Sequence, residues 1–167
     1  MSYFEYIGPP AAGKTTKMAE EFRGHINLQC HKKLDSYLQF SKQIYFFFTI
    51  YGFEKFKRFA FSIYHLYLIE FSASQLVIDQ GLVQIYLSHC SEENFTLDSK
   101  RLARILKIID SKFDNLNFIF LGEDIGLNEI NLRLKKRNNH RRNGVDGVFL
   151  KSFKGSMRLL KQHIEKY

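Results

Sequence analysis

Residues 3–16 of the chain, YFEYIGPPAAGKTT, are the stretch that decides its fold. Residues 3–7 are aromatic or β-branched apart from one glutamate, and the Gly-Pro-Pro turn that follows them ends the run, so they predict a short buried strand. The next eight residues, Gly8 to Thr15, match G-x-x-x-x-G-K-S/T at every fixed position. A helix is predicted over residues 14–22. A strand, a glycine-bearing loop and a helix in this order predict a phosphate-binding P-loop.

The residues of this loop suit a nucleoside triphosphate with Mg²⁺. Gly8 and Gly13 allow the backbone to wrap closely around phosphate oxygens, and the helix start adds N–H groups and a positive dipole end. Lys14 is expected to reach the β- and γ-phosphates and Thr15 to ligate Mg²⁺, while Thr16 contacts the α-phosphate. We therefore expect ATP and Mg²⁺ as cofactors. The expected binding residues are Gly8, Pro9, Pro10, Ala11, Ala12, Gly13, Lys14, Thr15 and Thr16.

Strands and helices are predicted to alternate along the rest of the chain. Short apolar runs predict buried strands at residues 75–79 and 117–121, and a further short strand at 25–29. Helical character extends over 34–72, with a break at Gly52, and is predicted again at 82–89, 98–113, 125–137 and 148–167. Residues 90–96 and 138–147 are polar and predict loops. The alternation predicts a three-layer α/β P-loop NTPase fold, with a central parallel sheet and helices on both faces, in one domain over 1–167.

Asp79 ends the apolar run at 75–79, where a Walker B acid is expected. Ligands of open parallel sheets bind beyond the carboxyl ends of the strands, so Asp79 and the P-loop should share one edge. The carboxylate could hold Mg²⁺, partly through water, or accept the proton of an attacking hydroxyl. A structural alternative is that Asp79 caps the helix that starts near Leu82.

The positive charge of the chain is concentrated near its end. Residues 131–167 have a charge balance of +9 and the preceding residues one of −1. Arg133, Arg137 and Arg141 are spaced to share one face of a continuing helix. They predict a basic lid over about 131–147 that neutralises transferred phosphate, so we count them with Lys14 and Asp79 as candidate catalytic residues. A solvated basic face or a nucleic-acid patch are the alternatives.

The segment at about 31–73 is expected to line the acceptor side of the site. Its aromatic run at 45–53 is too short to span a bilayer, and it permits three interpretations: buried core, stacking on a base or sugar, or peripheral contact with a membrane or protein. His31, Asp35 and His65 are possible polar contacts there. Nothing in the sequence selects among a nucleoside, a nucleotide, a sugar and a lipid-linked substrate.

The cysteines and the first residues indicate a cytoplasmic protein. Cys30 and Cys90 lack metal-type spacing and are expected to be reduced thiols, and the first residues do not have the pattern of a signal peptide. We expect no transmembrane segment.

Three stretches resemble the P-loop nucleoside and nucleotide kinases. Residues 8–16, GPPAAGKTT, are similar to the phosphate loop of adenylate kinase. Residues 76–81, LVIDQG, stand where thymidylate kinase and the deoxynucleoside kinases carry an acid-Arg motif, with Gln80 in place of the arginine. Residues 118–142 resemble the strand, helix and arginine-bearing lid of these kinases. Ala11 replaces a frequent glycine of the loop, and the final strand and adenine loop of the family have no clear counterpart.

The resemblance implies a kinase that transfers the γ-phosphoryl group of ATP to a small-molecule acceptor. The same residues leave two other functions open. One is a P-loop ATPase that acts as a switch or assembly factor, although no acid follows Asp79 to activate water. The other is an NTPase that binds nucleic acid through the basic segment. A guanine-reading NKxD motif is absent, which disfavours a GTPase.

Overall fold

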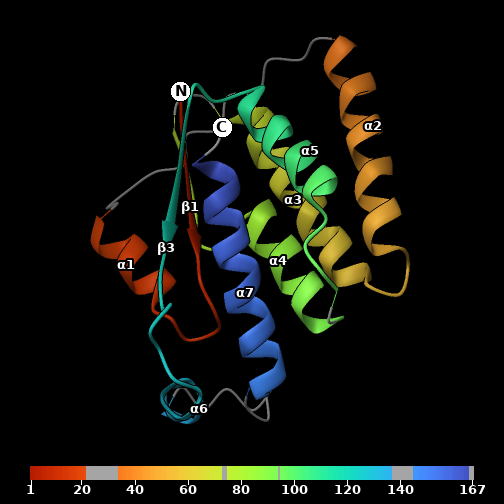
Figure 1. Ribbon diagram of the computed structural model, residues 1–167. Coiled ribbons are helices and arrows are strands. Elements are labelled where there is room, and N and C mark those ends of the chain that lie inside the picture. Colours follow the sequence, from red (N-terminus) through yellow and green to blue (C-terminus); the bar gives the residue numbers. More distant parts are fainter. Residues whose placement is uncertain (22–33, 73–74, 94, 137–144, 166–167) are drawn as a thin grey trace.

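The computed structural model describes residues 1–21, 34–72, 75–93, 95–136 and 145–165. Each strand is followed along the chain by two or three described helices (Figure 1). The elements in order are β1 (Ser2–Ile7), α1 (Lys14–Glu21), α2 (Leu34–Tyr51), α3 (Phe56–Phe71), β2 (Gln75–Ile78), α4 (Leu82–Glu92), α5 (Ser99–Asp110), β3 (Asn115–Phe120), α6 (Leu127–Lys136) and α7 (Gly147–Ile164).

The sheet that the described residues form has three parallel strands in the order β2-β1-β3. Strand β1 is central, because Ser2 lies beside Gln75 on one side and beside Asn115 on the other. Parallel strands all end at the same edge of a sheet. The P-loop, which follows β1, therefore lies beside the residues that follow β2 and β3.

Helices cover both faces of this sheet. Successive side chains of a strand point to opposite faces. Tyr3 and Ile7 belong to the main hydrophobic core, while the Tyr6 hydroxyl donates to Glu21 of α1 on the other face. Figure 1 shows α1 on one side of the strands and α4, α5 and α7 on the other, with α2 outermost. The predicted three-layer α/β fold with a central parallel sheet is confirmed.

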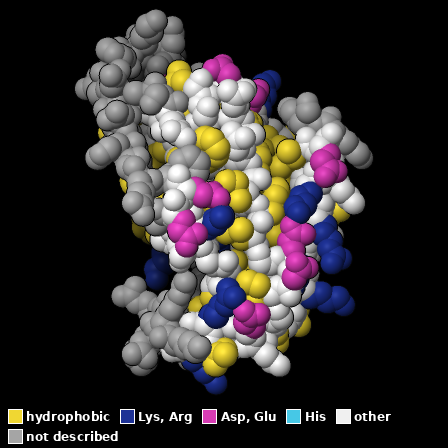
Figure 2. Space-filling view, turned by 90° about the vertical axis from the view of Figure 1, so that its left-hand side faces the viewer, with side chains coloured by type: hydrophobic (Ala, Val, Ile, Leu, Met, Phe, Trp, Pro, Cys, Tyr) yellow, Lys and Arg dark blue, Asp and Glu magenta, His cyan; other side chains and the backbone are white. Residues whose placement is uncertain are grey.

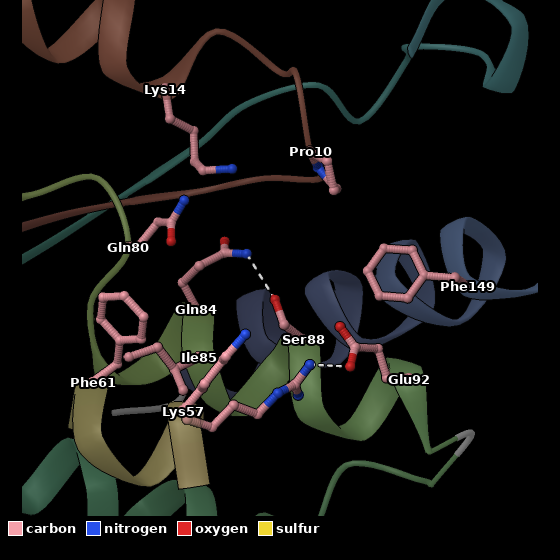
Figure 3. A pocket seen from close by; sticks show the side chains of 11 residues that line it. Pro10, Lys14, Lys57, Phe61, Gln80, Gln84, Ile85, Ser88, Glu92 and Phe149 are labelled. Carbon is pink, nitrogen blue, oxygen red and sulfur yellow. Dashed lines mark hydrogen bonds and ion pairs between the residues drawn. The ribbon is translucent and has the colours of Figure 1, made fainter. Parts of the chain in front are cut away.

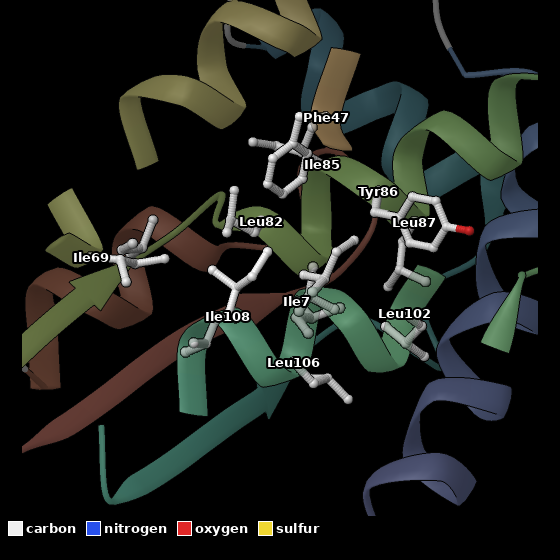
Figure 4. Close-up of a cluster of buried hydrophobic side chains, with 14 of the residues drawn as sticks. Ile7, Phe47, Ile69, Leu82, Ile85, Tyr86, Leu87, Leu102, Leu106 and Ile108 are labelled. Carbon is white, nitrogen blue, oxygen red and sulfur yellow. The ribbon is translucent and has the colours of Figure 1, made fainter. Parts of the chain in front are cut away.

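The main core lies between the sheet and the helices on its far side from α1. Figure 4 shows its centre, where side chains of β1, α4 and α5 meet. Helix α4 contributes an almost unbroken run of buried residues from Leu82 to Leu87, so it is enclosed on nearly every side. This burial fixes α4, the helix that forms one wall of the candidate site, against the central strand.

Most predicted elements occur within a few residues of their expected bounds. The break at Gly52 is confirmed, since Gly52 has a φ of 58° and separates α2 from α3. The loop predicted from residue 90 was wrong in its first part, because α4 continues through Glu92. Cys90 and Ser91 are buried there, and the Ser91 hydroxyl donates back to the Leu87 carbonyl at 2.8 Å. The predicted strand at 25–29 and most of the loop at 138–147 lie outside the described residues.

The aromatic run at 45–53 is divided between core and surface. Phe46, Phe47 and Tyr51 are buried, whereas Tyr45 and Phe53 are 69% and 79% exposed. The core interpretation therefore holds for one face of α2 only. None of the described helices is long and apolar enough to cross a membrane.

Candidate active site

The P-loop leaves the central strand and passes into α1, as the motif predicts. Ala11 and Gly13 have φ angles of 60° and 86°, in the left-handed region that favours glycine. Ala11, which replaces a frequent glycine, therefore holds a glycine-like conformation. The Gly8 backbone passes so close to β3 that a Cβ there would lie 2.5 Å from the Leu121 carbonyl oxygen. Gly8 is thus required for packing as well as for the turn.

Lys14 lies at the centre of this loop. Its ammonium donates to the carbonyl oxygens of Gly8 and Pro9, at 2.7 Å and 3.1 Å, and its side chain is largely buried. The carbonyls hold the cation at the mouth of the P-loop. The first turn of α1 contains no acidic residue, so the positive end of the helix dipole is not neutralised by its own side chains.

Thr15 and Asp79 meet at the edge of the sheet. The Thr15 hydroxyl donates to Asp79 Oδ2 at 2.6 Å, across 64 residues of sequence. The carboxylate thus lies beside the P-loop, and the N-cap interpretation of Asp79 was wrong because Gly81 occupies the N-cap position of α4. One hydroxyl and one carboxylate oxygen are the kind of ligands that Mg²⁺ takes from proteins, with phosphates and water completing the shell. No cluster of three or more metal-ligating side chains occurs among the described residues.

Arg133 is the one predicted lid arginine that the structure describes. It lies on α6, and its Nη1 donates to the Ala11 carbonyl at 3.3 Å while Nη2 pairs with Glu129. A small hydrophobic cluster of Ile130, Leu134, Val145 and Leu150 holds α6 against the start of α7. The arginine therefore contacts the P-loop. Arg137 and Arg141 lie outside the described residues.

Two hollows flank the P-loop on opposite sides. The inner cleft, of about 210 Å³, lies between the P-loop, α3, α4 and the first turn of α7. Its polar lining includes Lys14, Lys57, Arg58, Gln84, Ser88 and Glu92 (Figure 3). The outer groove, of about 510 Å³, is more open and runs beside α1. It is lined by Ala12, Gly13, Thr16, Lys17, Leu121 and Arg133, among others.

A buried network that sequence reasoning missed joins the P-loop to α4. The Gly8 N–H donates to Gln84 Oε1 at 2.9 Å, and the Gln84 N–H donates to Glu5 Oε1 at 2.7 Å. Glu5 is fully buried in the central strand and also accepts the Tyr3 hydroxyl at 2.6 Å. Gly81 leaves the space for this arrangement, because a Cβ there would lie 2.5 Å from Glu5 Cδ.

Burial dominates the electrostatics of Glu5. It raises the pKa of this carboxyl to about 7, although hydrogen bonds from Tyr3 and from the N–H groups of Gln84, Val83 and Gly81 lower it. In the sequence, the only sign that Glu5 has a special role is that it is an acidic residue inside an otherwise apolar strand. Its role in holding the start of α4 depends on packing between segments that are distant in the sequence.

His65 lies near the site, but its ring makes a contact within its own helix. The ring Nδ1 lies 2.8 Å from the Phe61 carbonyl in the same helix, and burial lowers the pKa of the imidazole. Cys90 is a free, buried thiol, as expected. Cys30 and His31, and the side chain of Asp35, lie outside what the structure describes.

Among the residues that the structure describes, the face of the molecule that carries α1 shows no continuous basic field. In Figure 2, basic and acidic side chains lie next to each other there, with hydrophobic side chains between them. Ion pairs of this kind include Lys17 with Glu21 and Lys161 with Glu123. Part of the excess charge of residues 131–167 is therefore neutralised locally by acids from elsewhere in the chain.

Comparison with known proteins finds one solved structure of low similarity. No protein-family model and no curated protein matches the chain. A solved structure of the deoxyadenosine kinase from M. mycoides with bound dATP is similar to it with a TM-score of 0.45. The sequence identity is 13%, and the similarity covers 99% of this chain and 86% of that chain. Similarity at this level supports no inference about the activity of the chain.

Proposed function

We propose that this protein is a kinase that transfers the γ-phosphoryl group of ATP, bound with Mg²⁺, to a small-molecule acceptor. The observation that carries the proposal is the meeting of Thr15 and Asp79, 2.6 Å apart, beside Lys14 and between two separate hollows. A transfer between two molecules needs room for both on either side of the moving phosphoryl group.

The outer groove is the proposed place for the nucleoside part of ATP. It begins at Gly13 and Thr16, next to the positive end of α1, and Arg133 forms its far wall. A guanidinium can stack on a base or pair with phosphate oxygens. We infer that the triphosphate passes from this groove into the P-loop, where Lys14 would exchange its two carbonyl contacts for phosphate oxygens.

Thr15 and Asp79 are the proposed Mg²⁺ site. The bound ion would supply charge neutralisation for the phosphates. The Asp79 carboxylate would orient the Thr15 hydroxyl through the hydrogen bond already present. Arg137 and Arg141 remain candidates for the lid, on the grounds of sequence alone.

The proposal is tested by assaying ADP formation with nucleosides, nucleotides and sugars as candidate acceptors. We expect an acceptor to raise ADP formation above the background of ATP and Mg²⁺ alone. Lys14→Met should abolish that increase, and Asp79→Asn should shift the Mg²⁺ dependence to higher concentration. Lys107→Gln, an exposed lysine on α5 that lines neither hollow, serves as the control and should behave like the wild type.

A different result would replace this function with another. Rapid ADP formation that no acceptor alters, but that depends on Lys14, would overturn the kinase and favour a P-loop ATPase. If ATP with Mg²⁺ does not bind at all, both nucleotide-dependent functions fail.

A further inference from the structure

The inner cleft has an excess of positive charge that binding ATP does not require. Three of its lining side chains are cations, Lys14, Lys57 and Arg58, against one carboxylate, Glu92. Lys14 is assigned to the P-loop. Lys57 and Arg58 are consecutive residues of α3, on the opposite wall, and Figure 3 shows Lys57 extending from that helix toward the cleft.

Arg58 is held in place by an ion pair, but not all of its guanidinium N–H groups have a hydrogen-bond partner. Its Nη2 pairs with Glu92 of α4, which fixes the guanidinium against the cleft wall. Its Nη1 is buried and has no hydrogen-bond partner within the described part of the chain. A buried charged donor without an acceptor is costly, and such groups are rare in folded proteins. Because Nη1 has almost no accessible surface, a ligand in the cleft would meet the positive charge of Arg58 and not this buried hydrogen.

Neighbouring polar groups of α4 are also arranged to donate. Ser88 Oγ accepts a hydrogen bond from Gln84 Nε2 at 3.1 Å, so its own hydroxyl hydrogen remains to be donated (Figure 3). The Gln84 amide has a second hydrogen as well, while its oxygen already accepts the Gly8 N–H. The one carboxylate of the cleft, Glu92, is paired with Arg58. The wall therefore presents donors from Lys57 and Ser88, beside the positive charge of Arg58.

We propose that the inner cleft binds an anionic group, a phosphate or a carboxylate, through Lys57, Arg58 and Ser88. An anion of this type is a pure acceptor of hydrogen bonds, which matches a wall of donors. Binding of the anion does not depend on the proposed kinase activity, but the identification of this anion as the phosphoryl acceptor does. If the protein is the proposed kinase, its acceptor is an anionic metabolite and not a neutral nucleoside or sugar.

The experiment measures binding by calorimetry with the P-loop occupied by AMPPNP and Mg²⁺. Inorganic phosphate and acetate are the two anion probes, and AMP and adenosine are a charged and neutral pair. We expect AMP to bind at least about tenfold more tightly than adenosine, and phosphate or acetate to compete with it. The probe that competes more strongly identifies the anion.

Matched variants locate the site. Lys57→Gln and Ser88→Ala should each weaken the binding of the competing anion, by about tenfold for the lysine. AMPPNP affinity should stay within about twofold of the wild type, because neither residue contacts the outer groove. Lys107→Gln should change neither affinity. Arg58→Gln is the third variant, and Lys57→Gln keeps the test valid if Arg58→Gln fails to fold.

Three outcomes would overturn the inference: equal binding of AMP and adenosine, anion binding that Lys57→Gln leaves unchanged, or no anion binding at millimolar concentration. Failure of the kinase proposal would look different. In that case AMPPNP would not bind, yet inorganic phosphate would still bind to the Lys14→Met variant in a manner that depends on Lys57.

Discussion

At the scale of single residues, two glycines show how differently one residue type can be used. Gly81 faces the buried Glu5 carboxyl, and a Cβ there would also lie 2.6 Å from the Tyr3 hydroxyl oxygen. Gly155 lies inside α7, is exposed, and would place a Cβ with nothing within 4 Å. The first glycine is required by close packing, and the second only weakens its helix.

Alanine substitutions should therefore have opposite effects at these two positions. Gly81→Ala forces Glu5 or Tyr3 to move and should lower the free energy of unfolding by about 1–3 kcal/mol. Gly155→Ala should raise it by about 0.5–1 kcal/mol, since alanine is the better helix former. Urea unfolding of both variants beside the wild type measures the difference. A Gly81→Ala protein as stable as the wild type would show that the Glu5 site is less tightly packed than described.

At the scale of elements, Glu5 joins the central strand to the start of α4. Its carboxylate oxygens receive the Gln84 N–H and the Tyr3 hydroxyl, and the side chain of the same Gln84 holds Gly8. Strand, helix and P-loop are thus held by one buried acid. Burial raises the pKa of Glu5 to about 7, above the usual value of 4.5. The stability of this connection between strand, helix and P-loop therefore depends on pH.

The sign of the dependence follows from the raised pKa. The stabilising contribution of protonated Glu5 is complete below about pH 4.5 and is lost as the pH rises through about 7. Glu5→Gln cannot ionise, so the stability of the wild type relative to this variant should fall between pH 5 and pH 8, by up to about 3 kcal/mol. Urea unfolding at several pH values measures it. The buried histidines are present in both proteins and largely cancel, so parallel curves would contradict the raised pKa.

At the scale of the whole molecule, ligand binding should stabilise the fold. The P-loop leaves the central strand, so the proposed site for ATP with Mg²⁺ exists only when the sheet is formed. At a hundred times its Kd, ATP with Mg²⁺ should add about 2.7 kcal/mol to the free energy of unfolding. For a chain of this size that corresponds to a rise in Tm of roughly 5–10 °C. Thermal unfolding with and without ATP measures the rise, which Lys14→Met or chelation of Mg²⁺ should remove or reduce.

The equivalent concentration of Mg²⁺ alone is the control for this measurement. An identical rise in the Lys14→Met variant would mean that ATP binds elsewhere on the molecule, and the proposed donor site would have to be abandoned.

Parts of the fold and site could be predicted because they depend on local sequence. The P-loop needs two glycines, a lysine and a threonine at fixed spacing, and a strand end places Asp79 beside them through the geometry of parallel sheets alone. Glu5, Gln84, Lys57 and Arg58 escaped prediction because their surroundings come from segments dozens of residues away. The helical course of Cys90 to Glu92 was missed because these residues are polar in composition but partly buried in the fold.

The central position of β1 also affects how the protein folds. This strand pairs with residues 75–78 and 115–120, so it cannot complete its hydrogen bonds until residues 115–120 have been synthesised. Such long-range pairing slows folding and leaves strand edges exposed in the meantime. The P-loop is therefore synthesised well before the two strands that fix its position in the sheet. A nascent chain that stops before residue 115 should be unable to hold a nucleotide and should depend on chaperones.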